Sequence, residues 1–240
     1  MLNAYLTATS NLLQNPAAPN ALYSTANLTS YINTARGQLA GESACIRVQG
    51  AISISSGTRG YVFGNISLPG ASGVQDVLNV RTVWLVSGSG MVWLTPVSYE
   101  EFSLYDLNSA SPATGAPTKW AQYGQSVLGS VLFSPIPSAP GTAKVDCVCL
   151  PVPLADDTTP EAIPALWTDA VPYFAAYLAL LSSQTGVRTA EADKMFERYQ
   201  MFVERARRAA TSAVLPWQFD QVQVPGGVNA QVSQGAGGQR

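Results

Sequence analysis

The sequence contains no histidine, and only 12% of its 240 residues are charged, about half of the usual share. The absence of histidine removes the commonest general base, the commonest zinc ligand and every catalytic triad that uses an imidazole. The formal net charge is −2, so the chain has no basic surplus with which to neutralise phosphates. This balance argues against direct binding to DNA or RNA.

Cysteine is also scarce, with three residues at positions 45, 147 and 149. Cys147 and Cys149 stand two apart in an apolar run, so on a strand they point to the same face. Two thiols without further soft ligands make a poor metal site, and we predict buried packing, with a disulfide or metal role as the alternative. The odd count and the lack of a cleavable signal indicate a reducing compartment.

Long apolar runs are absent. The longest, residues 170–181, is interrupted by Pro172 and is shorter than the about 20 residues that a membrane-spanning helix needs. We therefore expect no membrane partner.

The two ends of the chain have helical periodicity. Apolar residues recur at helical spacing over residues 2–13 and again from Ser24 to Leu39, where Gly41 is placed to end the helix. Residues 166–183 form an apolar segment with Pro172 near its start, and residues 189–211 form a charged amphipathic segment. We predict four helices from these patterns.

The middle of the chain changes to a period of two, which is typical of strands. Strands are predicted near residues 46–54, 61–68, 77–86, 91–95, 119–123, 127–133 and 142–150. The clearest turn is SGSG at residues 87–90, which predicts a hairpin. A capping box, SYEE at residues 98–101, predicts a short helix that runs to about Leu107.

These patterns predict an α+β fold in which a helical bundle, formed by the N- and C-terminal helices, carries an inserted antiparallel β domain and an extended C-terminal arm. The expected boundaries are residues 1–43 and 155–212 for the bundle, 44–154 for the β domain and 213–240 for the arm.

Few residues suggest chemistry. Asp156, Asp157 and Glu161 could form a carboxylate pair or a calcium site, but no ligand loop accompanies them, and a solvated loop before a helix is the expectation. The Gly-rich stretches lack the spacing of nucleotide-binding loops and are predicted to be turns. We expect no catalytic residue, metal or cofactor. Trp84 and Trp93 are predicted to be core residues, with a carbohydrate-binding platform as the alternative.

Two groups of residues suggest contacts with other chains. Arg205, Arg207 and Arg208 lie in the last turns of a predicted helix, where a salt bridge to a neighbouring subunit or an interaction with the helix C-terminus is favoured over a phosphate contact. The arm is otherwise polar and has too few apolar residues to form a core of its own. This favours docking of Trp217 and Phe219 in a pocket on a partner.

Several strings resemble a segment of the head–tail connector (adaptor) proteins of tailed bacteriophages. They are WAQYG at residues 120–124, LFSPIP at 132–137 and PVPLADD at 151–157, followed by IPALW at 163–167 at the start of a helix. A second helix with an Ala/Glu/Tyr/Arg pattern over 190–210 and the string LTSYINTARGQL at 28–39 are also similar to the family. The resemblance covers most of residues 24–212.

The resemblance implies a non-enzymatic structural protein of the virion, made in the cytoplasm of the bacterial host. Such adaptors form a ring, typically twelvefold, between the portal protein and the tail nozzle or tube protein. The partners implied are therefore the portal, the tail protein and copies of the chain itself, with DNA passing through the channel without specific binding. The side chains implied in docking the arm on the portal are Leu215, Trp217, Phe219, Val222 and Val224.

Two other functions stay open at the level of sequence. One is another component of the virion, such as a tail nozzle, a tube or a capsid decoration. The other, from a different class, is a β-sandwich carbohydrate-binding protein.

Overall fold

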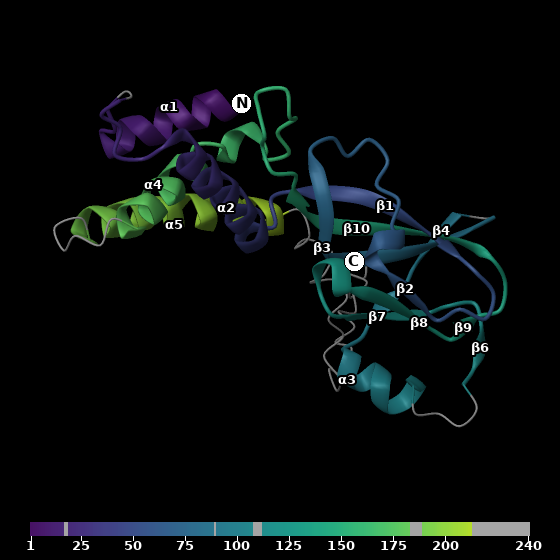
Figure 1. Cartoon of the computed structure of the whole chain (residues 1–240). Helices are drawn as coiled ribbons and strands as arrows, with labels where there is room; N and C mark the ends of the chain where they lie inside the picture. Colours follow the sequence, from purple (N-terminus) through teal and green to yellow (C-terminus); the bar gives the residue numbers. More distant parts are fainter. Residues whose placement is uncertain (17–18, 89, 108–111, 183–188, 213–240) are drawn as a thin grey trace, which may run out of the picture.

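The computed structural model describes residues 1–16, 19–88, 90–107, 112–182 and 189–212. It contains both helices and antiparallel sheets, which confirms the α+β class (Figure 1). The helices of the two chain ends lie together on one side, and the strands of the middle of the chain lie on the other (Figure 1). None of the described helices is long and apolar enough to cross a membrane.

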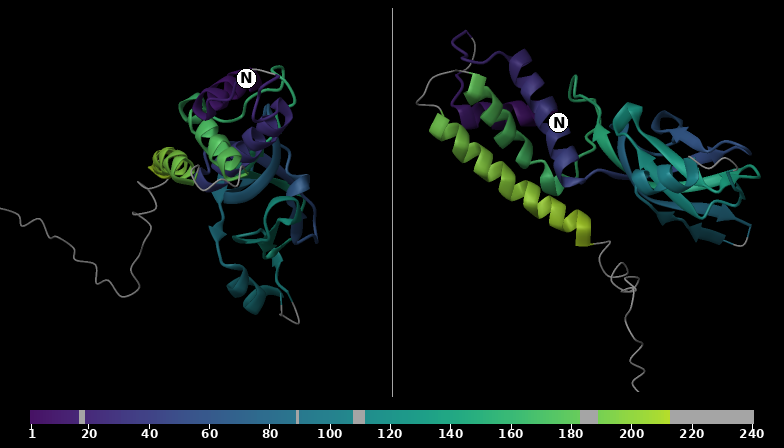
Figure 2. Two further views of the ribbon diagram at one scale, coloured as in Figure 1. Left: turned by 60° about the vertical axis from the view of Figure 1, so that its left-hand side comes forward. Right: turned by 90° about the horizontal axis from the view of Figure 1, so that it is seen from below.

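The helical part is centred on α4. This helix packs against the other three long helices, and α2 also contacts both α1 and α5. The four helices are α1 (Leu2–Leu13), α2 (Thr25–Ser43), α4 (Ala170–Ser182) and α5 (Thr189–Ser212). Residues 152–169, which lead to α4, form a connector. The connector and the outer helix α5 lie on opposite sides of the helical part (Figure 2, left).

Two helix boundaries differ from the prediction. Helix α2 continues past Gly41 to Ser43, and Ala44 adopts the left-handed conformation that ends it. The buried side chains of Leu39 and Ser43 explain this, because packing of the last turn outweighs the weak helix propensity of glycine. Helix α4 begins at Ala170 and not at Leu166, and a separate 3-10 turn, η4 (Ala165–Trp167), precedes it.

The strands of the described residues form two four-stranded sheets and one two-stranded sheet. The first sheet has the order β1-β10-β3-β4 and is antiparallel throughout. The second has the order β2-β8-β7-β5, in which β5 runs parallel to β7. The short strands β6 and β9 pair in parallel.

The strand bounds of the first sheet are β1 (Arg47–Ile54), β3 (Val74–Ser87), β4 (Gly90–Trp93) and β10 (Gly141–Pro151). Those of the other sheets are β2 (Gly60–Val62), β5 (Thr95–Pro96), β6 (Thr114–Gly115), β7 (Lys119–Tyr123), β8 (Ser130–Ser134) and β9 (Ile136–Pro137). The predicted hairpin is confirmed, because β3 and β4 pair with Ser87 opposite Gly90.

Two short segments differ from the strands predicted for them. The strand expected over residues 61–68 ends at Val62 and gives way to a 3-10 turn, η1 (Phe63–Asn65), because the buried Phe63 donates its N–H to the Gly129 carbonyl 2.9 Å away. A second 3-10 turn, η3 (Ser126–Leu128), delays the start of β8. The predicted short helix after the capping box is confirmed to Leu107, since α3 (Tyr99–Phe102) continues directly as a π-helical turn, η2 (Ser103–Leu107).

One continuous hydrophobic core runs from the sheets into the helices and includes Ile32, Val145, Phe133 and Phe174. Cys147 and Cys149 are fully buried in this core as free thiols, which confirms the predicted packing. Burial raises the pKa of Cys147 to about 12 and that of Cys149 to about 11.

Candidate functional site

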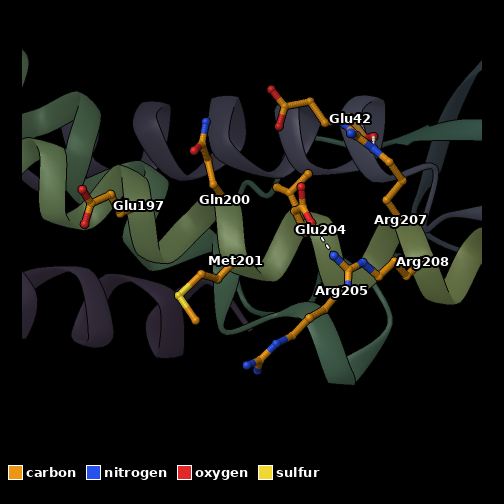
Figure 3. Close-up of a pocket in the computed structure, with 9 residues that line it drawn as sticks. Glu42, Glu197, Gln200, Met201, Glu204, Arg205, Arg207 and Arg208 are labelled. Carbon is orange, nitrogen blue, oxygen red and sulfur yellow. Dashed lines mark hydrogen bonds and ion pairs between the residues drawn. The ribbon is translucent and has the colours of Figure 1, made fainter.

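The most extensive charged feature of the described residues lies on α5. A surface groove of about 580 Å³ runs along this helix, with Met201 and Val203 as its apolar members and charged residues of α5 around them (Figure 3). Met201 is 47% exposed, whereas most large apolar side chains of the other three long helices are buried. The last turns of α2 border the groove through Glu42.

The structure places the three predicted arginines along this groove, each in a different setting. Arg208 bonds Glu204 at 2.9 Å, one turn earlier on the same helix, and both side chains are more than 60% exposed. Arg207 donates from Nε to the Glu42 carbonyl oxygen at 3.2 Å and so ties α5 to the end of α2. Arg205 is exposed and projects away from the other labelled side chains, and it bonds no described residue (Figure 3).

The side chain of Glu42 also holds α5, through a hydrogen bond with Tyr199. Tyr199 is fully buried and donates its hydroxyl to Glu42 Oε2 at 3.0 Å. Burial, together with the negative charge of Glu42, raises the pKa of Tyr199 above its ordinary value. At this point α5 is therefore held to α2 by a part-buried hydrogen bond and a surface one.

A buried ion pair fixes the connector on the helical part. Arg36 of α2 has no exposed side-chain surface, and its Nη2 lies 2.8 Å from Glu161 Oε1. Tyr5 of α1 donates to the other carboxylate oxygen of Glu161 at 2.9 Å. Arg36 also donates to the Val152 carbonyl oxygen at 2.7 Å. The network thus joins α1, α2 and the start and middle of the segment between β10 and α4.

The sequence predicted that Glu161 lies in a solvated loop. This prediction is wrong, because the carboxylate of Glu161 is buried in this network. Its partner Arg36 was not singled out by sequence reasoning. The signal was present, because position 36 falls within the apolar stripe that Leu28, Ile32 and Leu39 define on α2. A charged residue in such a stripe requires a buried partner.

Asp156 and Asp157 remain at the surface. Asp156 Oδ1 accepts four hydrogen bonds from the backbone and hydroxyl groups of Thr158 and Thr159, which fold the loop into a tight turn. Asp157 accepts from the backbone N–H of Asn3 at 2.8 Å and so fixes the loop to the start of α1. The hydrogen bonds from Thr158 and Thr159 lower the pKa of Asp156. The pKa of Asp157 is lowered first by the N-terminal ammonium, which donates to it at 2.8 Å, and then by Asn3.

The two tryptophans of the hairpin lie directly opposite each other, since Trp84 of β3 pairs with Trp93 of β4. Both are half-buried, and Lys144 of β10 is the cross-strand partner of Trp84 on the other side. Both were predicted to be core residues, and the structure instead leaves each of them half-buried.

The predicted docking residues Leu215, Trp217, Phe219, Val222 and Val224 lie outside the described residues. Within the described ranges, no group of three or more cysteine, aspartate or glutamate side chains is arranged to hold a metal ion.

The fold and the groove define a class of protein. It is an α+β protein whose helical part presents a charged outer helix. The sequence model of the SU10 adaptor protein family matches residues 4–220, and the chain belongs to this family. The match confirms the resemblance to the head–tail adaptors of tailed bacteriophages and identifies a structural protein of the virion.

No match was found among curated proteins. Among solved structures, the chain is similar to one in the neck of an empty GTA particle computed with C6 symmetry, with 14% identity, 81% of this chain and 87% of that chain covered, and a TM-score of 0.27. The family match, and not this likeness, carries the assignment.

Proposed function

We propose that copies of this chain form a closed ring, most simply of twelve subunits, between the portal protein and the tail nozzle or tube. The ring extends the channel through which DNA leaves the head. The observation that carries the proposal is the match to the adaptor family over residues 4–220, nearly the whole chain. The role is structural, with no catalytic step.

The composition of the chain supports a channel wall that does not grip DNA. A net charge of −2 leaves few cations to hold phosphates, so DNA can slide past without specific contacts. In the described residues the densest basic cluster is the end of α5, where Glu204 and the Glu42 carbonyl already engage two of the three arginines.

The three arginines of α5 support a role in contacts between subunits. They lie on the exposed face of α5, and they border a groove that also contains Met201 and Val203. Repeated around a ring, individually modest contacts of this kind add up, because each subunit is held by two neighbours.

In the proposed assembly, residues 1–43 and 155–212 form the bundle, and residues 44–154 form an inserted domain that faces the tail or neighbouring adaptors. Residues 213–240 form the arm that reaches onto the portal. The arm contains Trp217 and Phe219 in a polar setting, and such isolated aromatics are typical anchors in partner pockets. The protein is made in the host cytoplasm and has no membrane partner.

Negative-stain electron microscopy of the full chain mixed with the portal protein encoded beside it tests the proposal. Portal rings are expected to gain a second layer, and a chain truncated after Ser212 is expected to lose it while keeping its circular dichroism spectrum. Portal rings that stay unchanged with the full chain would refute the adaptor position and favour a more distal role in the virion. A second layer that survives truncation would refute the role of the arm alone.

A further inference from the structure

Two neighbouring strands carry the chain between the helical part and the β domain. Helix α2 ends at Ser43 and leads into β1, and β10 ends at Pro151 and leads into the connector. The two crossings lie side by side, because Arg47 of β1 pairs with Val148 of β10. Neighbouring strands are only about 4.8 Å apart, so the two crossings by themselves form a narrow joint about which the two parts are free to turn.

The start of β3 makes a further contact, although β3 has no covalent link of its own to the helical part. This strand lies beyond β10, two strand spacings or about 10 Å from β1. The carbonyl oxygen of Gly73, directly before β3, accepts a hydrogen bond from the Val152 N–H at 2.8 Å. A Cβ on Gly73 would lie 2.5 Å from the Pro160 carbonyl oxygen and 3.3 Å from the Ala162 nitrogen. The contact is therefore made backbone to backbone, and it depends on glycine at this position.

The connector, which receives this contact, is held firmly on the helical part. Asn33 of α2 exchanges two hydrogen bonds with the backbone of Leu154, at 2.7 and 3.1 Å. Glu161 is bound by Arg36 of α2 and by Tyr5 of α1. A contact of the β domain with the connector is thus a contact with both of these helices.

A contact that is offset from a narrow joint removes the freedom to turn about it. Helix α2 packs against β10, which already carries a crossing, whereas Gly73 lies at the next strand along the sheet. We propose that residues 70–73 and the connector form a latch that fixes the angle between the β domain and the helical part. Every subunit of a closed ring needs the same shape, so the latch lets each copy meet the next at one angle. This last step rests on the proposed ring.

Spin labels on the two parts measure the angle in the full-length chain. Labels on the exposed sites Arg198→Cys and Ser87→Cys, in a Cys45→Ser background, are expected to give one narrow distance distribution by pulsed electron paramagnetic resonance. Gly73→Ala is expected to widen that distribution at least about twofold, because an unlatched joint behaves as a hinge. Gly70→Ala is the matched control, since Gly70 lies in the same loop with φ +72° and has nothing within 4 Å of an added Cβ. No widening is expected for it.

A second variant releases the latch from the connector side. Val152→Pro removes the N–H that bonds the Gly73 carbonyl, and it is expected to widen the distribution as Gly73→Ala does. Both variants are expected to keep the circular dichroism spectrum of the unmodified chain. On the portal, both are expected to lower the fraction of rings with a complete second layer at least about threefold, whereas Gly70→Ala keeps that fraction, because subunits of variable shape close a ring poorly.

The outcomes separate the latch from the ring. An unchanged distribution in Gly73→Ala or Val152→Pro, or an equal widening in Gly70→Ala, would overturn the latch. Widened distributions with undiminished second layers would overturn its role in the ring. The distances are measured on the free chain, so they test the latch even if the unmodified chain adds no layer to the portal, a result that would refute the proposed ring instead.

Discussion

Removal of the Glu161 carboxylate is the sharpest test of how this fold is held together. Glu161 is 9% exposed and accepts four hydrogen bonds, two from the fully buried Arg36 at 2.8 and 3.1 Å. The others come from the Tyr5 hydroxyl and the Ile163 N–H, both at 2.9 Å. The substitution Glu161→Gln keeps the shape of the side chain and removes its charge.

The expected loss in the free energy of unfolding follows from the hydrogen bonds that Arg36 keeps after the substitution. In Glu161→Gln, Arg36 keeps its bond to the Val152 carbonyl oxygen and a weak one of 3.4 Å to Asn33, but its buried charge is no longer compensated. Breaking a buried pair from one side costs about 3–5 kcal/mol. For a chain of this size, this corresponds to a fall in melting temperature of about 6–20 °C.

Urea unfolding followed by tryptophan fluorescence and circular dichroism measures the effect. Glu204→Gln is the control, because it breaks the exposed pair with Arg208 and should cost less than about 0.5 kcal/mol. The double variant Arg36→Met/Glu161→Leu should recover most of the loss, since no unpaired charge remains. A loss below about 1 kcal/mol for Glu161→Gln would refute the argument that the connector is held by this pair.

Three further predictions concern the rest of the fold. The pKa of Tyr199 in the folded state lies above the ordinary 10.0, so its contribution to the free energy of unfolding is present below pH 10 and is lost as the pH rises past 10. Tyr199→Phe should therefore reduce the fall in melting temperature that is measured between pH 10 and higher pH. Cys147 and Cys149, whose pKa values are raised, should resist alkylation at pH 8 in the native protein and react after unfolding, as mass spectrometry can show; rapid native labelling would contradict their burial. Gly73→Ala should lower the melting temperature, because Gly73 has φ +75° and an added Cβ would lie 2.5 Å from a connector carbonyl oxygen; an unchanged melt would contradict this contact.

Sequence reasoning was most successful where the signal was local. The apolar spacing from Leu28 to Leu39 predicts α2, and the turn at residues 87–90 predicts the β3–β4 hairpin. The alternation around Cys147 and Cys149 predicts their common buried face. In each case the relevant neighbours are within a few residues, so periodicity and turn chemistry are sufficient.

The candidate interface was predicted only in part. The position of Arg205, Arg207 and Arg208 in the last turns of a helix favoured a contact between subunits, and the structure places them along an exposed groove. Which of them is engaged within the subunit depends on Glu42, which is 165 residues from Arg207 in the chain. A local sequence pattern cannot show that two residues so far apart in the chain are in contact.

The sequence by itself determined the α+β class, the helical ends and the absence of imidazole chemistry, because these follow from composition and from short-range periodicity. Only the tertiary structure decided the sheet order β1-β10-β3-β4 and the pairing of Arg36 with Glu161, 125 residues away. The physical reason is that burial and pairing depend on which surfaces meet in space. For the same reason Glu161 is buried against Arg36, whereas its near neighbour Asp156 lies at the surface.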